Sequence, residues 1–197
     1  MKKLIIGTRN PKKREELVKL LEGLPLDIRS IEDYPGLPEV EEDGKTFREN
    51  AVKKAATIAR LAGELVMGED SGLEVDALNG VPGVRSARYA GEKATYEENN
   101  RKLLKAMEGT PLERRTARFC CTLALANPEG LLFVVEGQCE GFVSQEPKGE
   151  HGFGYDPVFY LPDYGKTFAE LGPTVKNQIS HRAQALKKFR ERLKQFI

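Results

Sequence analysis

Apolar positions along the chain follow two periods, one typical of strands and the other typical of helices. A short apolar run at residues 3–8 precedes a segment from Pro11 to Leu21 whose apolar residues have helical spacing, and a second apolar run covers residues 26–31. We therefore expect a strand, a tight turn, a helix and another strand in this order.

Two later segments begin with a capping box, in which a Thr is followed three residues on by a Glu. Thr46 and Glu49 predict a helix over about residues 46–62, and Thr95 and Glu98 predict the start of another helix. The acidic, proline-containing stretch that precedes the first box is typical of an irregular loop.

The second half of the chain is rich in strand patterns. Residues 65–67 predict a short strand that leads into a turn at Glu69 and Asp70, and residues 73–77 alternate as in another strand. Residues 115–126 and 131–143 predict a long hairpin, which is followed by a strand at 158–161 and a closing helix from Ser180.

These elements favour an α/β fold in which helices flank a mixed sheet. The 197 residues fit one domain, and a domain of two lobes with a cleft between them would suit this element order.

Composition removes several classes of function. The 31 basic and 30 acidic side chains nearly cancel, which argues against a protein that binds polymeric nucleic acid. No apolar stretch is long enough for a membrane span or a signal peptide, so we expect no membrane partner and a cytoplasmic location. Cys120, Cys121 and Cys139 lack metal-site spacing and are predicted to be buried thiols.

The first helix begins with basic residues. Lys12, Lys13 and Arg14 stand at the positive end of the helix dipole, where cations are unfavourable unless an anion is bound there. A strand, a turn, free backbone N–H groups and a lysine form a phosphate-binding arrangement. A solvated basic face is the alternative interpretation of these residues.

The last helix repeats the pattern. Ser180 is a suitable N-cap, but His181 and Arg182 occupy the first helical positions and Lys176 comes shortly before. A forked guanidinium and an imidazole suit a base or a phosphate, although surface positions are the commoner meaning of such residues.

A phosphate site usually brings Mg²⁺, which takes one or two protein carboxylates. Two acidic clusters are available, one at residues 39–43 and one at Glu69 and Asp70. We expect Asp70 to be the stronger ligand because it follows an apolar strand. The glycine-rich segment 149–157 suits a flat base, with a plain turn as its alternative.

Six motifs in order resemble the inosine triphosphate pyrophosphatase family, also called the Ham1 family. They are TRNPKK at 8–13, EEDGKTFRENAVKKA at 41–55, DSGL at 70–73, PGVRSARYAG at 82–91, GFGYDPVF at 152–159 and KNQISHRAQAL at 176–186. The resemblance covers nearly the whole chain.

The resemblance implies an elongated mixed sheet with two lobes and a cleft, a homodimer, Mg²⁺ as cofactor, and hydrolysis of ITP, dITP and XTP to the monophosphate and pyrophosphate. It assigns Asp70 as metal ligand and water-activating base and Glu41 as the other metal ligand. It also implies that substrate is bound by Thr8, Arg9, Asn10, Pro11, Lys12, Lys13, Lys54, Ser71, Phe153, Gly154, Tyr155, Asp156, Lys176, His181 and Arg182. Donors on His181 and Arg182 would select a 6-keto purine.

Two positions depart from the family pattern. Glu69 stands where the first Asp of DDSG is usual, and His151 stands where the first Gly of GGFGYD is usual. The first makes a non-catalytic nucleotide-binding module conceivable. The second would strain the loop if its position required a positive φ.

Overall fold

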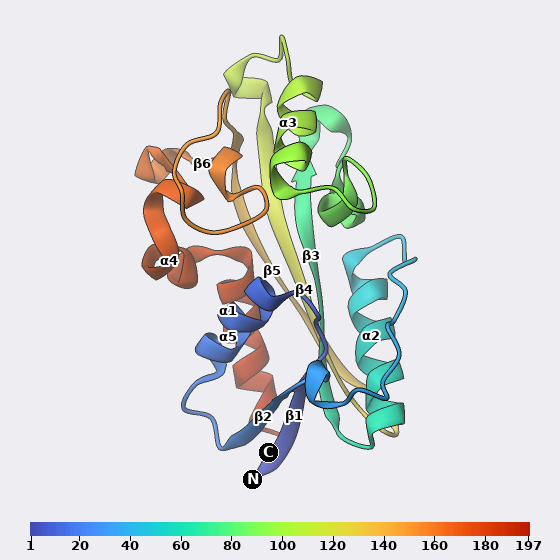
Figure 1. Ribbon diagram of the computed structural model, residues 1–197. Helices are drawn as coiled ribbons and strands as arrows, with labels where there is room; N and C mark the ends of the chain where they lie inside the picture. Colours follow the sequence, from blue (N-terminus) through green and yellow to red (C-terminus); the bar gives the residue numbers. More distant parts are fainter. The chain divides into compact units, whose positions relative to one another are not determined.

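The computed structural model describes residues 1–197 and contains seven strands and five α-helices (Figure 1). The strands are β1 (Lys2–Ile6), β2 (Leu26–Ser30), β3 (Leu65–Val75), β4 (Thr116–Asn127), β5 (Gly130–Val143), β6 (Phe159–Leu161) and β7 (Lys166–Thr167). The helices are α1 (Pro11–Leu21), α2 (Phe47–Ala62), α3 (Tyr96–Ala106), α4 (Phe168–Ile179) and α5 (His181–Leu193). None of the helices is long and apolar enough to cross a membrane.

The strands form one mixed sheet in the order β2-β1-β3-β4-β5-β6-β7. β1 pairs in parallel with β2 and with β3, whereas β6 pairs antiparallel with β5 and with β7. Only two residues separate β4 from its neighbour β5, a connection that requires an antiparallel hairpin. The mixed α/β sheet and this hairpin are therefore as the sequence predicts.

The chain divides into two compact units. The first unit comprises residues 1–70, 121–137 and 182–197, and the second comprises residues 71–120 and 138–181. β3, β4 and β5 contribute residues to both units.

The first unit buries both faces of its strands. Leu17 of α1 and Phe189 of α5 pack in one apolar cluster with Leu4 and Leu123 of the strands. The alanine-rich face of α2 forms a separate cluster with the opposite strand face, so this unit has helix, sheet and helix layers (Figure 1). Burial on both faces explains why these strands read as apolar runs rather than as alternating patterns.

The second unit has its own core. Leu103 and Met107 of the α3 region pack with Phe119 of β4, Phe159 of β6 and Phe168 of α4. Phe159 lies close to Phe119 and Phe168, with ring centroids 4.6 and 5.2 Å apart.

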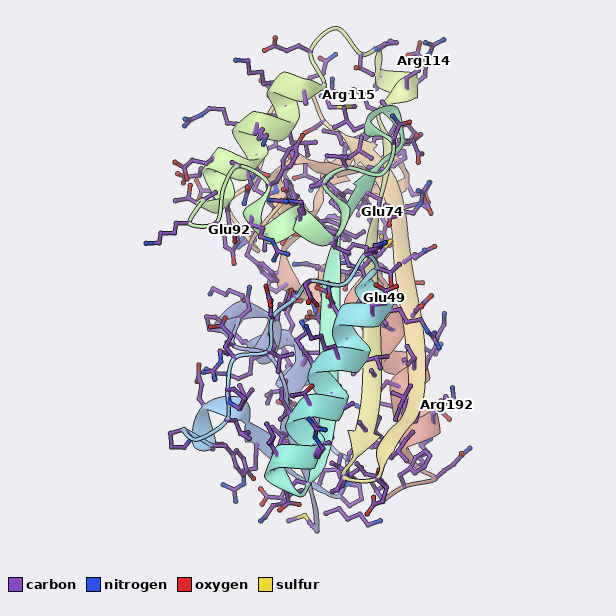
Figure 2. The ribbon with its side chains drawn as sticks, turned by 90° about the vertical axis from the view of Figure 1, so that its right-hand side faces the viewer. Glu49, Glu74, Glu92, Arg114, Arg115 and Arg192 are labelled. Carbon is purple, nitrogen blue, oxygen red and sulfur yellow. The ribbon has the colours of Figure 1, made fainter.

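The predicted helix starts agree with the structure. The Thr46 side chain accepts a hydrogen bond from the Glu49 amide, and Glu49 lies in the first turn of α2 (Figure 2). The Glu49 carboxylate accepts from the Lys45 amide rather than from Thr46, whereas Thr95 and Glu98 form both bonds of a capping box. Asn10 caps α1, which begins at Pro11 as expected.

Two predictions about the elements are wrong. The turn expected at Glu69 and Asp70 is absent, because β3 continues through both residues from Leu65 to Val75. A carboxylate can remain in a buried strand when buried partners hold it, and both residues have such partners. The second concerns the segment before Ser180, where no helix is predicted because Gly172 and Pro173 interrupt the helical pattern. The structure has the helix α4 there, and Lys176 lies within it.

Candidate active site

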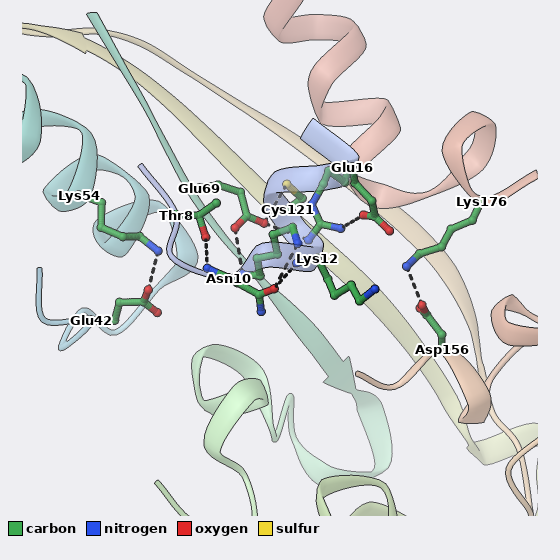
Figure 3. Close-up of polar contacts among 12 residues, drawn as sticks. Thr8, Asn10, Lys12, Glu16, Glu42, Lys54, Glu69, Cys121, Asp156 and Lys176 are labelled. Carbon is green, nitrogen blue, oxygen red and sulfur yellow. Dashed lines mark hydrogen bonds and ion pairs between the residues drawn. The ribbon is translucent and has the colours of Figure 1, made fainter. Parts of the chain in front are cut away.

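The start of α1 is capped within the chain. The Asn10 side chain accepts hydrogen bonds from the backbone amides of Lys12 and Lys13, and the Asn10 amide donates to the Thr8 hydroxyl oxygen (Figure 3). The prediction of free N–H groups at this helix start is therefore wrong for these two amides.

Glu69 joins the two basic helix starts. Its carboxylate is fully buried, lies 2.9 Å from the Lys13 ammonium of α1 and accepts a hydrogen bond of 3.1 Å from the Arg182 guanidinium of α5. Arg182 also donates to Glu16 of α1 (Figure 3), and the Cys121 thiol donates weakly to Glu69. We call Lys13, Glu16, Glu69 and Arg182 the Glu69 cluster.

Charge within the Glu69 cluster is balanced. Burial lowers the pKa of Lys13, but the negative charges of Glu69 and Asp70 outweigh burial and the pKa lies above its ordinary value. Burial acts against Arg182 in the same way, and Glu69 and Glu16 again raise its pKa. Neither cation belongs to a solvated basic face, because the Lys13 side chain is 16% exposed and that of Arg182 is 2% exposed.

Asp70 is buried next to the Glu69 cluster in the same strand. Only 3% of the residue is exposed, and its Oδ2 accepts a hydrogen bond of 2.9 Å from the Asn50 amide of α2. Burial raises the pKa of Asp70 above its ordinary value, although the charges of Lys13 and Lys54 and the Asn50 bond act in the opposite direction. A carboxylate with a raised pKa is a better proton acceptor than an ordinary surface aspartate.

The acidic loop before α2 contributes Glu42. Its carboxylate pairs with the buried Lys54 ammonium at 2.6 Å (Figure 3), and its charge raises the pKa of Asp70 further. Glu41, the residue that the resemblance assigns to the metal, is exposed. Within this loop, the charge of Glu42 therefore acts on Asp70.

The donor set around Asp70 suits a hard cation. No group of three or more His, Cys, Asp or Glu side chains is assembled for a metal. Asp70 and Glu42 supply two carboxylates, which is the number that Mg²⁺ takes from a protein when phosphate oxygens and water complete its octahedron. The residues present therefore fit Mg²⁺ bound together with a phosphorylated substrate.

The second unit holds the glycine-rich loop. The buried Asp156 carboxylate accepts hydrogen bonds from the Phe153 amide at 2.9 Å and from the Lys176 ammonium of α4 at 2.6 Å (Figure 3). The ammonium also lies 4.4 Å from the centre of the Phe153 ring. A side chain at Gly152 would place its Cβ 2.0 Å from Asp156, so only glycine fits this turn. The Asp156 carboxylate thereby holds the Lys176 ammonium and the loop that carries the Phe153 ring close to each other.

Other residues of the second unit keep this loop in place. The Tyr155 hydroxyl donates to the Ser86 carbonyl, and the Asn100 side-chain amide of α3 donates to the Gly154 carbonyl. His181 is buried and stacks on Phe119 at 4.6 Å between ring centroids. His151 does not have a positive φ, so its difference from the family glycine strains no backbone.

The remaining predicted substrate residues differ in exposure. Arg9 is exposed and donates to the Leu37 carbonyl, and the Lys12 side chain is 59% exposed beside Glu15. Pro11 is also exposed, and Ser71 is partly buried in the second unit.

Sequence reasoning missed three polar residues that hold these side chains, namely Glu16, Asn50 and Asn100. Asn50 carries a usable signal, since Asn is a poor helix former in the middle of a predicted helix. Glu16 and Asn100 carry none, because their partners are far away in the sequence.

Comparison with known proteins identifies the family of this chain. The Ham1 family model matches residues 4–192. The dITP/XTP pyrophosphatase of Desulforamulus reducens is 54% identical over 189 residues, covering 96% of this chain and 94% of that protein. The dITP/XTP pyrophosphatase of Geobacter sulfurreducens is 49% identical over 193 residues, covering 98% of this chain and 97% of that protein.

A solved structure shares the fold at full length. The HAM1 protein from Coxiella burnetii has a TM-score of 0.91 and 40% sequence identity, and the match covers 99% of this chain and 100% of that one. Family model, sequence relatives and solved structure all extend over nearly the whole chain. The chain belongs to the Ham1 family.

Proposed function

We propose that this chain hydrolyses non-canonical purine nucleoside triphosphates such as dITP, ITP and XTP to the nucleoside monophosphate and pyrophosphate. The relatives named dITP/XTP pyrophosphatase support this activity at 46–54% identity over nearly the full chain. The observation that carries it in the structure is the buried Asp70 carboxylate, whose pKa is raised by burial and acted on by the charges of Lys13 and Lys54.

Asp70 is proposed as the general base. The raised pKa lets the carboxylate take a proton from a water molecule that attacks the α-phosphorus, and Asn50 holds the Oδ2 atom of Asp70 in a fixed position. The bond between the α-phosphorus and the bridging oxygen to the β-phosphate breaks, and pyrophosphate leaves with the electron pair.

Lys13 and Lys54 are proposed to stabilise the leaving pyrophosphate. Both ammonium groups are held in place before substrate arrives, Lys13 by Glu69 and Lys54 by Glu42. Preorganised cations of this kind stabilise developing charge without reorganisation during the reaction, a contribution of several kcal/mol in enzymes. The Asn10 cap fixes the helix start that carries Lys13.

Mg²⁺ is proposed as the cofactor, with Asp70 as one ligand. The second ligand comes from the acidic loop, where the resemblance implies Glu41, which is exposed, and the structure favours Glu42, whose charge acts on Asp70. When bound, the ion supplies positive charge that neutralises the phosphate oxygens. Phosphate oxygens and water complete the site.

Base selection is proposed for the loop around Phe153 together with Lys176 and His181. The Phe153 ring offers a stacking face, and Lys176 offers a donor to a keto oxygen that adenine lacks. Arg182 joins them in our prediction from the sequence. In the structure, two of its guanidinium nitrogens donate to Glu16 and Glu69.

A homodimer is the assembly that the family resemblance implies, and we propose it for this chain. Light scattering coupled to size-exclusion chromatography measures the mass directly, with twice 22.0 kDa expected.

The activity is tested by a panel of ITP, dITP, XTP, GTP and ATP in the presence of Mg²⁺, with separate detection of pyrophosphate and orthophosphate. We expect pyrophosphate release with the first three nucleotides and much slower release with ATP and GTP. Orthophosphate as the primary product would indicate a phosphatase, and absence of any turnover would indicate a nucleotide-binding module.

A further inference from the structure

A buried amide links the two parts of the proposed metal site. Asn50 lies in the first half of α2 and is fully buried. Its side chain is an unfavourable choice for a helix interior, because Asn is a weak helix former. The two hydrogen bonds of this side chain account for its presence.

The partners of Asn50 lie on opposite sides of its amide group. The Asn50 Nδ2 atom donates to Oδ2 of Asp70 at 2.9 Å, and the Asn50 Oδ1 atom accepts from the backbone N–H of Gly44 at 2.7 Å. A carboxylate only accepts and a backbone N–H only donates, so these partners determine the orientation of the amide. Asn50 therefore ties the acidic loop to the catalytic carboxylate.

The absence of a side chain at Gly44 makes this contact possible. A Cβ at Gly44 would lie 2.5 Å from the Asn50 Oδ1 atom and 2.8 Å from the Glu49 Cβ atom, closer than real Cβ atoms approach their neighbours. The backbone conformation of Gly44 does not require glycine, because its φ is not positive. Glycine is needed here so that the loop can come within hydrogen-bond distance of Asn50.

We propose that Asn50 is a positioning residue that sets the spacing between Asp70 and the acidic loop carrying Glu42, and thereby the affinity for the divalent cation. Two of its properties are suited to this role. It fixes one Asp70 oxygen, and it holds the loop two residues from Glu42. Partners that orient metal ligands typically change metal affinity or activity by 10–100-fold when they are removed. This inference rests on the proposed function.

The direct test is a titration of the protein with Mn²⁺ alone, followed by the electron paramagnetic resonance signal of the free ion. The titration compares four proteins: wild type, Asp70→Asn, Asn50→Ala and Asn50→Leu. Leu fills the volume of Asn but makes none of its hydrogen bonds. We expect wild-type binding to be lost in Asp70→Asn and weakened at least about 10-fold in both Asn50 variants. A matching rise in the Mg²⁺ concentration for half-maximal pyrophosphate release is expected, with partial recovery at excess Mg²⁺.

Asn99→Ala is the matched control. Asn99 also lies in a helix and is 2% exposed, and its amide bonds the backbone of Ala90 and Ala87 but no carboxylate. This variant loses a similar pair of hydrogen bonds, and its Mn²⁺ affinity should stay within about 2-fold of wild type, a difference below the 10-fold expected for removal of a ligand's partner.

A second variant keeps the inference testable if Asn50→Ala fails to fold. Gly44→Ala leaves Asn50 intact but forces the loop away from its amide, so it should weaken Mn²⁺ binding in the same direction. Wild-type affinity in folded Asn50→Ala or Gly44→Ala overturns the inference. Failure of the proposed function is seen separately, as a wild-type protein that releases no pyrophosphate.

Discussion

Glu69 and Asp70 are neighbouring buried carboxylates that lie in opposite electrostatic surroundings. Glu69 contacts the cations of Lys13 and Arg182 directly. Asp70 contacts a neutral amide, and burial raises its pKa in spite of the lysines nearby. The charge of Glu69 is therefore compensated by cations, whereas burial disfavours the charge of Asp70.

Asp70→Asn should separate activity from stability. A carboxyl group whose pKa rises on folding binds its proton more tightly in the folded state, so its ionised form opposes folding at neutral pH. The neutral isostere removes this cost together with the general base. We expect pyrophosphate release to fall at least about 100-fold, while urea unfolding gives an equal or higher free energy. Retained turnover, or clear destabilisation, would contradict this assignment.

Glu69→Gln should have the opposite effect on stability. It leaves Lys13 without its carboxylate and Arg182 with Glu16 alone, and breaking a buried ion pair costs about 3–5 kcal/mol. Urea unfolding measures the loss of stability. Glu136→Gln serves as the control because its carboxylate also pairs with an arginine, Arg48 at 3.6 Å, but both side chains are exposed. The control should change stability by less than about 0.5 kcal/mol. Equal stability of the two variants would sink the role given to the Glu69 cluster.

At the scale of elements, α2 and β3 pack so closely that the backbone of α2 lies against Gly68 of β3. Gly68 of β3 faces the Ala51 carbonyl and the Ala55 amide of α2, where an added Cβ would lie 2.2 and 2.7 Å away. The same pair of elements carries Asn50 and Asp70, so their close approach brings the amide to the carboxylate.

Gly68→Ala should therefore damage both stability and the site. The clash is with backbone atoms, which cannot rotate away, so α2 has to move; overpacking of this kind costs about 1–3 kcal/mol or more. A lower unfolding free energy together with weaker Mn²⁺ binding is the expected result. Gly36→Ala is the control, because nothing lies within 4 Å of its Cβ position. A Gly68 variant as stable as the Gly36 variant would show that the packing tolerates the methyl group.

Elements with a local signal could be predicted from the sequence. The caps at Thr46 and Thr95, Pro11 at the start of α1, and the apolar spacing behind them predict α1, α2 and α3 within a residue or two. α4 was missed although Thr167 and Glu170 form a capping box, because Gly172 and Pro173 conceal the helical pattern. The turn expected at Asp70 was wrong because the partners that keep these carboxylates in a strand come from other segments.

For the whole molecule, the sequence singled out charged groups whose partners it could not predict. Lys13 and Arg182 are predicted to bind an anion because each stands at a helix start, and in the structure both contact the carboxylate of Glu69. Arg182 and Glu69 are 113 residues apart in the chain, and Arg182 and Glu16 are 166 apart. No local pattern encodes such a contact. The expected activity came from the resemblance to the Ham1 family, because residue spacing alone indicates only that an anion is bound.

The measurement that tests the proposed function most directly is hydrolysis of dITP with Mg²⁺ in water enriched in oxygen-18, followed by phosphorus NMR. Attack of water on the α-phosphorus predicts pyrophosphate and deoxyinosine monophosphate as the only products, with the heavy oxygen in the monophosphate and turnover lost in Asp70→Asn. Label in the pyrophosphate, or release of orthophosphate with a diphosphate, would contradict the proposed reaction.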